Sequence, residues 1–514
     1  MSVKLSPKVF AFRRWFADAL STRLPMTTRA KIITALVIFT FSYVTKTLQA
    51  VDLAPVMYTT QQPLGGLTDT YDLRAASILR GEGLLGPYNI HPSRTVWVAQ
   101  APGYSIFLSL VYRMTGRDFF RVQMVQNAVN SLSPVLLFLI AGLVVSWRVG
   151  QVAGMIAALS HHFSHISNFI LPDSLSALPL LGAVLLITVA DRLRKRASAK
   201  HVYLLYASAG VMLAAAAWLR SQTMLMGLFL IPVLVLISTR RWKALKLAAT
   251  AAAVSILCIA PVTIKNYVVY GEFIPINIGM GIVLWEGIAE ASNYGFGTVA
   301  KDEEVAAQDA IIYNNPRYGG TWSSPDGVMR DRDRVRKSLE IIKNNPAWYA
   351  GVMVDRMREM FKYSANAPLV YKPSQVQGRA PAHPIKKGWE DRLSDGSVLR
   401  FGESLFWLRP VLRFLQRAIK ETLHLFIIAG LVMTAAASLR RTLFLLAVPV
   451  YYLIFQSFMH TEFRYTLPMH YFIFVFAAVG WTALGRLLLG GSRRLFEKLR
   501  PALTSTAQAP PPTR

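Results

Sequence analysis

The chain has 514 residues, of which 53% are hydrophobic and only 16% are charged, and its formal net charge is +28. Soluble domains carry about 25% charged residues, so a chain this apolar must place much of its surface in a membrane. The basic excess fits a nucleic-acid partner, anionic lipids or cytoplasmic loops, and composition alone does not choose among them. The single cysteine, Cys258, excludes an internal disulfide and a cysteine-based metal cluster.

Ten apolar segments are long enough, or nearly so, to cross a bilayer core, which takes about 20 residues. The first follows a basic segment, residues 1–31, and we expect a retained helix because its apolar run is longer than that of a usual signal peptide. The sequence therefore predicts an all-α polytopic membrane protein of about ten helices, and a bundle of 11 or 12 is also compatible with it. The ten segments are 32–50, 122–146, 149–170, 174–190, 202–219, 223–238, 247–264, 422–438, 442–459 and 466–485.

The charges of the connections favour one orientation. With the N-terminus inside, every second connection is cytoplasmic and should be rich in Lys and Arg. The connections 191–200 and 239–246 and the tail from residue 486 fit this rule, so both termini are predicted to be cytoplasmic. The basic excess then indicates orientation, and no nucleic-acid partner is predicted.

The same threading divides the chain into five parts. We expect a cytoplasmic tail, an N-terminal membrane module that includes a first outer loop, a large outer loop, C-terminal membrane helices and a second cytoplasmic tail with a disordered Pro-rich end. Within the large loop, the patterns predict amphipathic helices at 333–342 and 348–363 and an interfacial helix at 405–419. The five parts are 1–31, 32–265 with the loop 51–121, 266–420, 421–486 and 487–514.

Familiar motifs of soluble enzymes are absent from the sequence, including GxxxxGK[ST], GxGxxG, GxSxG and HExxH. Asp331-Arg332-Asp333 has the spacing of a metal-binding pair, but its alternating charges favour a solvated helix face. His161 and His165, with His162 between them, could share a helix face and suit a metal. Hydrogen-bonded histidines near the end of a span are the favoured interpretation, and no metal site is predicted.

Polar residues gather at the predicted outer ends of the spans. Together they would bring carboxylates and cations to one face of the membrane, which suits transfer between anionic lipid substrates. A carboxylate can take a proton from an attacking hydroxyl group, while Arg or Lys neutralises a phosphate leaving group. The members are Asp69, Tyr71, Asp72, Asp173, Arg220, Lys265, His460, Glu462 and Arg464.

Each member also has a structural interpretation. Asp69 could cap a helix, Asp72 could begin a helix whose exposed face includes Arg74, and Asp173 could cap its span. Arg220 could be an anchor that extends to the interface. The joint placement favours a functional role for Asp69, because ionisable groups near membrane depth are costly and are usually functional.

The order of these features resembles the polytopic GT-C glycosyltransferases that use polyprenyl-phosphate sugars, in the branch that includes protein O-mannosyltransferases and the lipid A aminoarabinose transferase. The resemblance covers about residues 32–485 and rests on the order of several short motifs. These include Asp69-Thr70-Tyr71-Asp72, Ala101-Pro102-Gly103-Tyr104, Pro172-Asp173, Trp218-Leu219-Arg220, Lys265-Asn266-Tyr267 and Glu462-Phe463-Arg464-Tyr465.

The resemblance implies a GT-C-like bundle with two long non-cytoplasmic loops, in which Asp69 is the general base. The enzyme would move a sugar, with inversion, from a polyprenyl-phosphate carrier to a lipid, glycan or protein acceptor on the outer face of the inner (plasma) membrane. Asp72 and Asp173 are the further catalytic candidates, although Glu is more usual in the family at the position of Asp173. The large loop, where members diverge, is expected to choose the acceptor.

The same carry-over predicts a set of binding residues. Arg220 and Arg464 fall on recurrent basic positions that could face the lipid phosphate. Lys265 stands where Arg is common and so loses a bidentate fork, and Arg94 could compensate for Gln100, which stands where some members place a phosphate-binding Lys. The substrate-binding candidates are Tyr71, Tyr104, His460 and Glu462.

Two further points stay open at the level of sequence. No cofactor is predicted, although a divalent cation could assist. A transporter or flippase for a lipid-linked saccharide is the alternative function, and it should carry polar or broken-helix features near the middle of the membrane. Here the ionisable residues gather at the outer ends of the spans, and Lys46 lies within a span near its outer end, which favours the enzyme.

Overall fold

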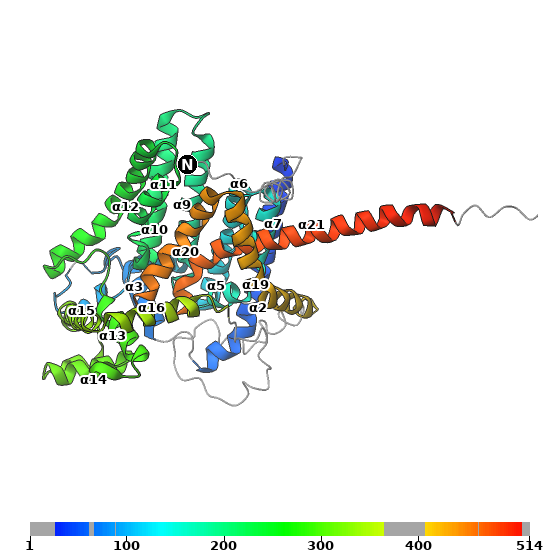
Figure 1. The fold of residues 1–514 in the computed structure, drawn as a ribbon. Helices are drawn as coiled ribbons and strands as arrows, with labels where there is room; N and C mark the ends of the chain where they lie inside the picture. The colour runs from blue at the N-terminus through cyan, green and yellow to red at the C-terminus, as the bar shows by residue number, and fades with distance from the viewer. Residues whose placement is uncertain (1–25, 61–65, 88, 364–406, 461, 506–514) are drawn as a thin grey trace, which may run out of the picture.

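The computed structural model describes residues 26–60, 66–87, 89–363, 407–460 and 462–505, and in these ranges the chain is helical with no strand (Figure 1). Eight helical stretches in these ranges are long and apolar enough to cross a membrane, and one of them, Phe119–Val144, joins two consecutive helices. The expectation of an all-α polytopic membrane protein is therefore confirmed. Most of the expected N-terminal tail, the end of the C-terminal tail and part of the large outer loop lie outside the described residues.

The N-terminal part of the chain supplies most of the bundle. Its helices are α2 (Thr28–Thr60), α3 (Gly66–Leu79), α4 (Gly103–Thr115), α5 (Phe119–Asn130), α6 (Leu132–Val144), α7 (Trp147–Leu159), α8 (His161–Ile166), α9 (Asp173–Leu193), α10 (Ala199–Leu219), α11 (Met226–Ile237) and α12 (Arg241–Tyr270). The later helices are α13 (Met280–Ala291), α14 (Asp302–Ile312), α15 (Gly327–Asn344), α16 (Pro346–Met360), α19 (Leu408–Ala437), α20 (Leu439–Ser457) and α21 (Leu467–Ser505).

All ten predicted spans fall on helices, but three of them are not single long helices. Segment 122–146 is divided between α5 and α6, which meet at Ser131, and segment 149–170 between α7 and α8. The second break has a local cause, because Ser160 leaves the helical conformation and its hydroxyl accepts a hydrogen bond from the Phe163 N–H at 3.2 Å, which caps α8. Segment 223–238 falls mainly on the short apolar helix α11. The number of ten spans stays a prediction.

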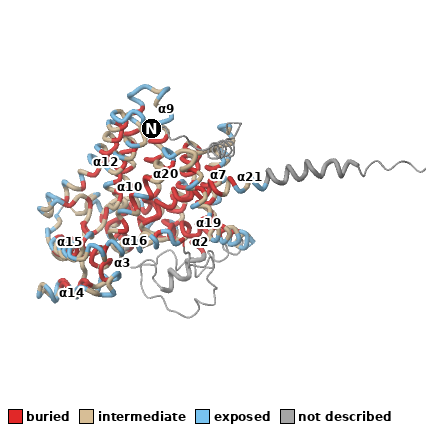
Figure 2. The backbone as a smooth tube through the Cα atoms, viewed as in Figure 1, coloured by how far each residue is buried: buried red, intermediate tan, exposed pale blue. Residues whose placement is uncertain are grey.

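The bundle is held together by close helix pairs. The most extensive contacts join α9 to α10, α19 to α21, α6 to α7 and α10 to α12, and Figure 2 shows the buried residues concentrated where these helices pack. Gly430 of α19 illustrates how near they come, since a Cβ atom there would collide with the Phe476 carbonyl of α21. Small residues at such contacts let helix backbones approach in a membrane protein.

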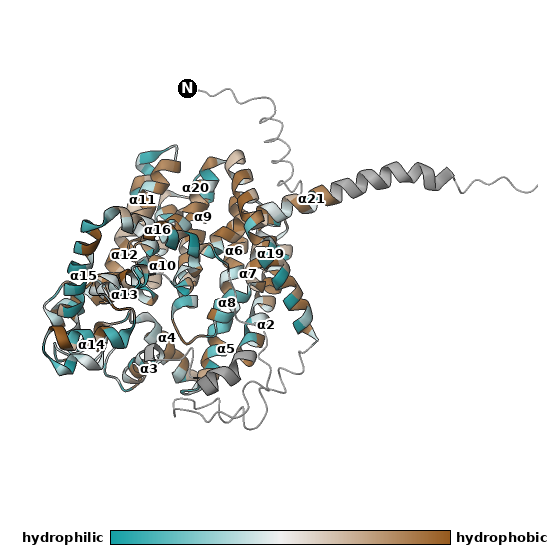
Figure 3. Ribbon diagram, turned by 60° about the horizontal axis from the view of Figure 1, so that its bottom comes forward, coloured by the Kyte–Doolittle hydropathy of each residue, from teal (hydrophilic) through white to brown (hydrophobic). Residues whose placement is uncertain are grey.

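Helices α13 to α16 form a smaller cluster at one end of the bundle (Figure 1). In Figure 3 the bundle helices are mainly hydrophobic, whereas α15 carries many hydrophilic residues. The helices predicted at 333–342 and 348–363 correspond to α15 and α16. The segment 405–419 differs from expectation, because from Leu408 it is continuous with the next span in the 30-residue helix α19.

Connections that were predicted to share a side of the membrane lie at the same end of the bundle. At one end, Lys31 lies 4.3 Å from the ring centre of Trp147, so the start of α2 meets the turn before α7. At the other end, the Thr68 hydroxyl donates to the Ile170 carbonyl at 3.4 Å, which brings α3 to the segment before α9. The candidate site is built at this second end.

Candidate functional site

A buried ion pair lies at the centre of the second end. Asp173 is the first residue of α9 and Arg220 directly follows α10, and the Arg220 Nε atom donates to the Asp173 Oδ1 atom at 3.1 Å. The Asp173 side chain is 1% exposed, and its Oδ2 atom has no hydrogen-bond partner within the described residues. Pro172, and not Asp173, is the N-cap of α9, so the expectation of a simple capping aspartate is wrong. The pair presents a carboxylate oxygen that a ligand could use.

A second guanidinium group joins this pair through Tyr465. The centres of the Arg220 and Arg464 guanidinium groups lie 4.6 and 5.1 Å from the centre of the Tyr465 ring. Arg464 also donates to the Glu462 carboxylate at 2.6 Å, and the Gln222 side chain donates to the Tyr465 carbonyl at 2.9 Å. Two arginines are thus held near one aromatic ring. Such an arrangement is suited to binding the oxygens of a phosphate group.

Two tyrosines predicted to bind substrate lie beside this centre. The rings of Tyr71 and Tyr104 pack edge to face with centroids 5.2 Å apart, and the Tyr104 hydroxyl donates to the Gln126 side chain at 2.7 Å. Burial raises the pKa of Tyr71, and the charges of Arg220 and Asp173 act on it with opposite signs. Tyr71 therefore connects α3 electrostatically to the Asp173–Arg220 pair.

Asp69 precedes Tyr71 by two residues, in the first turn of α3, and is half-buried. Because α3 begins at Gly66, Asp69 is inside the helix and the capping interpretation is wrong for it. Its charge contributes to the raised pKa of Arg117, for which the hydrogen bond to Asp72 is the largest cause. The adjacent contact of Thr68 with Ile170 brings this turn of α3 to the segment that leads into α9.

Asp72 has a different environment from Asp173. It is buried, and its Oδ1 atom accepts hydrogen bonds from the Tyr112 hydroxyl at 2.8 Å and from the Arg117 Nε atom at 2.9 Å, while Arg117 also contacts Oδ2. These bonds attach α3 to α4 and to the turn after it. Asp72 is thus occupied by protein partners and does not join the Asp173–Arg220 pair.

Arg74 was expected on an exposed helix face and is instead buried. Its guanidinium group donates to the carbonyls of Gln100 at 2.8 Å and Val96 at 2.6 Å, and burial lowers its pKa to about 10. The correction has a physical reason, because the carbonyls of the 95–100 segment supply the polar partners that make burial of this charge tolerable. Arg74 was missed as a site-building residue.

Lys265 and Arg94 lie around the same 94–100 segment. The Lys265 ammonium group is 5.6 Å from the ring centre of Tyr270, whose hydroxyl donates to the Arg94 carbonyl at 3.5 Å. The Arg94 side chain is exposed. These two predicted phosphate-binding residues therefore lie around Tyr270, and the structure records no contact of either with the Asp173–Arg220 pair among the described residues.

His460 and Glu462 connect the centre to the large loop. The His460 Nδ1 atom lies 2.9 Å from a carboxylate oxygen of Glu290 in α13, and its Nε2 atom lies 3.9 Å from Glu462. The hydrogen bond from His460 lowers the pKa of Glu290. Since Glu462 also binds Arg464, α13 reaches the edge of the arginine centre.

The two metal-like motifs have other partners. Asp331 is buried and accepts from the backbone N–H groups of Gly281 at 3.0 Å and Ile282 at 3.2 Å, so it caps α13 and the expectation of a solvated face is wrong for it. Asp333 instead pairs with Lys337 at 2.8 Å on the exposed face. His161 and His162 are buried and His165 is half-buried, and the rings of His161 and His165 lie 6.2 Å apart. In the described ranges, no group of three or more His, Cys, Asp or Glu could hold a metal ion.

Sequence reasoning also missed three roles: Arg117 binds Asp72, the Tyr465 ring packs against Arg220 and Arg464, and Gln222 binds the Tyr465 carbonyl. The only available signal was position, since Tyr465 directly follows Arg464 and Gln222 follows Arg220 by two residues. Their roles depend on contacts between segments far apart in the chain.

Residues 99–264 match the family of dolichyl-phosphate-mannose-protein mannosyltransferases. This supports the resemblance over about a third of the chain, the part that includes Asp173, Arg220 and Tyr104. No curated protein sequence matches the chain.

Two solved structures are similar to this chain. One is an oligosaccharyltransferase from Archaeoglobus fulgidus in complex with zinc and sulfate, which is 15% identical to this chain with a TM-score of 0.43. The match covers 89% of this chain and 51% of the archaeal chain. The other is ArnT from Cupriavidus metallidurans bound to undecaprenyl phosphate, which is 11% identical with a TM-score of 0.35. The match covers 88% of this chain and 77% of the ArnT chain. The chain thus spans about half the length of the archaeal protein.

Proposed function

We propose that the protein is a membrane glycosyltransferase that moves a sugar from a polyprenyl-phosphate carrier to a lipid, glycan or protein acceptor. The observation that carries this proposal is the buried Asp173–Arg220 pair with Arg464 on the neighbouring Tyr465 ring. A lipid phosphate is a diffuse anion, and guanidinium groups match its oxygens in geometry and charge. The match of residues 99–264 to a family named for mannosyl transfer from dolichyl phosphate supports it.

In this proposal, the residues divide the reaction between them. Asp69 takes the proton from the acceptor hydroxyl, whose oxygen attacks the anomeric carbon as the bond to the phosphate breaks, so the configuration inverts. Arg220 and Arg464 stabilise the charge that develops on the departing phosphate. Asp173 holds Arg220 in place through its Oδ1 atom and leaves Oδ2 for the substrate. Asp72 positions α3 rather than reacting.

The proposed arrangement in the membrane follows the sequence assignment. The site faces away from the cytoplasm, both termini are cytoplasmic and the protein resides in the inner (plasma) membrane. Residues 32–265 form the catalytic module. The large loop, 266–420, selects the acceptor, which is supported by the contact of His460 with Glu290 of α13 at the edge of the arginine centre.

The test is transfer from a radiolabelled polyprenyl-phosphate sugar by the purified full chain. Asp69→Asn should reduce the rate by at least about 100-fold, because general-base catalysis contributes roughly 10²–10⁴. The control is Asp355→Asn, since Asp355 is 73% exposed on α16 and pairs with the equally exposed Arg358. Undiminished transfer by Asp69→Asn would refute the mechanism. If the wild type transfers no sugar but moves a lipid-linked saccharide across vesicle membranes, the transporter is the correct function.

A further inference from the structure

A cavity of about 470 Å³ lies at the end of the bundle opposite the candidate site. Helix α9 runs from the candidate site to the cavity, because Asp173 is its first residue and Asp191 lies near its other end. Its 21 residues span about 30 Å. The cavity is formed where α6, α9, α10, α11, α12 and α20 end or begin. It is therefore separate from the Asp173–Arg220 pair.

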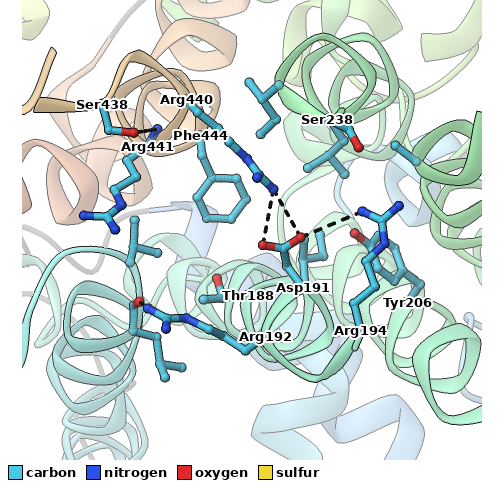
Figure 4. Close-up of a pocket in the computed structure, with 16 residues that line it drawn as sticks. Thr188, Asp191, Arg192, Arg194, Tyr206, Ser238, Ser438, Arg440, Arg441 and Phe444 are labelled. Atoms are coloured by element: carbon cyan, nitrogen blue, oxygen red, sulfur yellow. Dashed lines mark hydrogen bonds and ion pairs between the residues drawn. The ribbon is translucent and has the colours of Figure 1, made fainter. Parts of the chain in front are cut away.

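The lining of this cavity is strongly basic at its polar side. It includes four arginines and a single acid, Asp191. Arg440 binds Asp191 at 3.2 Å and Arg194 lies 4.0 Å from the same carboxylate. Figure 4 shows both of these side chains directed at Asp191, whereas the guanidinium groups of Arg192 and Arg441 point elsewhere.

These two arginines keep their charge uncompensated. Arg192 donates to the Leu143 carbonyl, and among the described residues neither Arg192 nor Arg441 forms an ion pair. Electrostatic repulsion acts between them, since both line the same cavity and Arg192 lies within range of Arg441. An anion placed between the two guanidinium groups would relieve this repulsion and accept their hydrogen bonds.

Beside these charged groups and a few hydroxyl side chains, part of the lining is apolar. Phe444 lies between the arginines in Figure 4, and Ile187, Leu234 and Ile237 contribute further hydrocarbon surface. A small hydrophilic anion would leave this surface unused, whereas a lipid has both a charged head and an apolar body. Basic pockets between transmembrane helices are suited to the head groups of anionic lipids.

We propose that this cavity binds the phosphate head group of an anionic phospholipid from the membrane leaflet at that end of the bundle. Arg192 and Arg441 bind the phosphate oxygens, Arg440 completes the basic rim, and the apolar lining takes the start of the acyl chains. The site goes beyond the proposed glycosyl transfer and does not depend on it. It would fix the ends of α9, α11 and α20 relative to one another.

The test is binding of phosphatidylglycerol to the purified full chain, measured by native mass spectrometry, with phosphatidylcholine and inorganic phosphate as comparison ligands. Wild type should bind phosphatidylglycerol in preference to phosphatidylcholine, and Arg192→Gln/Arg441→Gln should weaken that binding roughly 30-fold, about fivefold for each lost cation. The matched control is Arg240→Gln/Arg241→Gln, two exposed arginines at the same end that do not line the cavity. It should bind as wild type does.

A second measurement on the wild type keeps the test decisive if the double variant folds poorly. A phosphatidylglycerol analogue with a photoreactive head group should label peptides that contain Tyr206 or Phe444, both of which line the cavity. Labelling confined to other peptides would overturn the proposal, as would unchanged binding by Arg192→Gln/Arg441→Gln. Displacement of the lipid by inorganic phosphate at equal concentration would show that the site takes free phosphate instead. None of these readouts requires transferase activity, so failure here is distinguishable from failure of the proposed function.

Discussion

The Asp173–Arg220 pair shows how one ionic contact can be essential to the structure while adding little net stability. Two charges lose hydration when they are buried, and their attraction only approximately repays that cost. Removal of one partner leaves the other charge without compensation. The free-energy cost of losing the partner is larger for Asp173 than for Arg220, because the Asp173 side chain is 1% exposed and the Arg220 side chain is 24% exposed.

We expect Arg220→Gln to lower the free energy of unfolding by about 3–5 kcal/mol, because a buried carboxylate is left unpaired. Asp173→Asn should cost less, since water can still reach Arg220. The double variant should recover part of the loss of Arg220→Gln. Melting temperatures of the four proteins in one detergent give the comparison.

The exposed pair of Asp355 and Arg358 supplies the control for this series. Both side chains are 73% exposed, so Asp355→Asn should change stability by less than about 1 kcal/mol. Equal losses for Arg220→Gln and Asp355→Asn would show that the Asp173–Arg220 pair is not buried as the structure has it.

At the scale of elements, the site depends on a close approach of α4 to the end of α10. A Cβ atom at Gly103, the first residue of α4, would lie 2.6 Å from the Trp218 carbonyl oxygen, two residues before Arg220. Real Cβ atoms do not come so near to backbone oxygen, so only glycine fits here without a shift of one helix. This gives a physical reason for glycine in the Ala101-Pro102-Gly103 motif.

Gly103→Ala is therefore expected to destabilise the protein by about 1–3 kcal/mol, the usual cost of overpacking, and to reduce transfer by displacing Arg220. Gly351→Ala is the matched control, because nothing lies within 4 Å of a Cβ at this position in α16. There the change should be neutral or stabilising by up to about 1 kcal/mol, since alanine favours a helix. Equal melting temperatures of the two variants would contradict the close approach.

The helices themselves could be predicted well from sequence, and their ends and breaks less well. Hydropathy registers which segments are apolar, so all ten predicted spans fall on helices. It does not register backbone hydrogen bonding, so the break at Ser160 and the continuity of α19 from Leu408 were missed. The burial of Arg74 was missed for a related reason, because its partners are carbonyls of a segment more than 20 residues away.

At the scale of the whole molecule, the two ends of the bundle carry different sets of charged residues. One end gathers the basic connections around the arginine-rich cavity, and the other gathers the Asp173–Arg220 pair, the α3 turn with Asp69 and the loop helix α13. Sequence alone could predict this division, because the positive-inside rule depends only on the order of spans and charges. It could not predict which outer residues touch, because those contacts depend on how the helices pack.

The orientation itself can be tested because the chain has one cysteine. In a Cys258→Ser background, single cysteines at Glu303→Cys in α14 and Lys195→Cys after α9 are both exposed reporters, one at each end of the bundle. A membrane-impermeant maleimide added to intact spheroplasts should label Glu303→Cys at once and Lys195→Cys only after the membrane is permeabilised. The reverse pattern would place the candidate site in the cytoplasm, where the acceptor would be a cytoplasmic molecule. Labelling of both residues in intact spheroplasts would show that the two ends of the bundle lie on the same side, so that α9 does not cross the membrane.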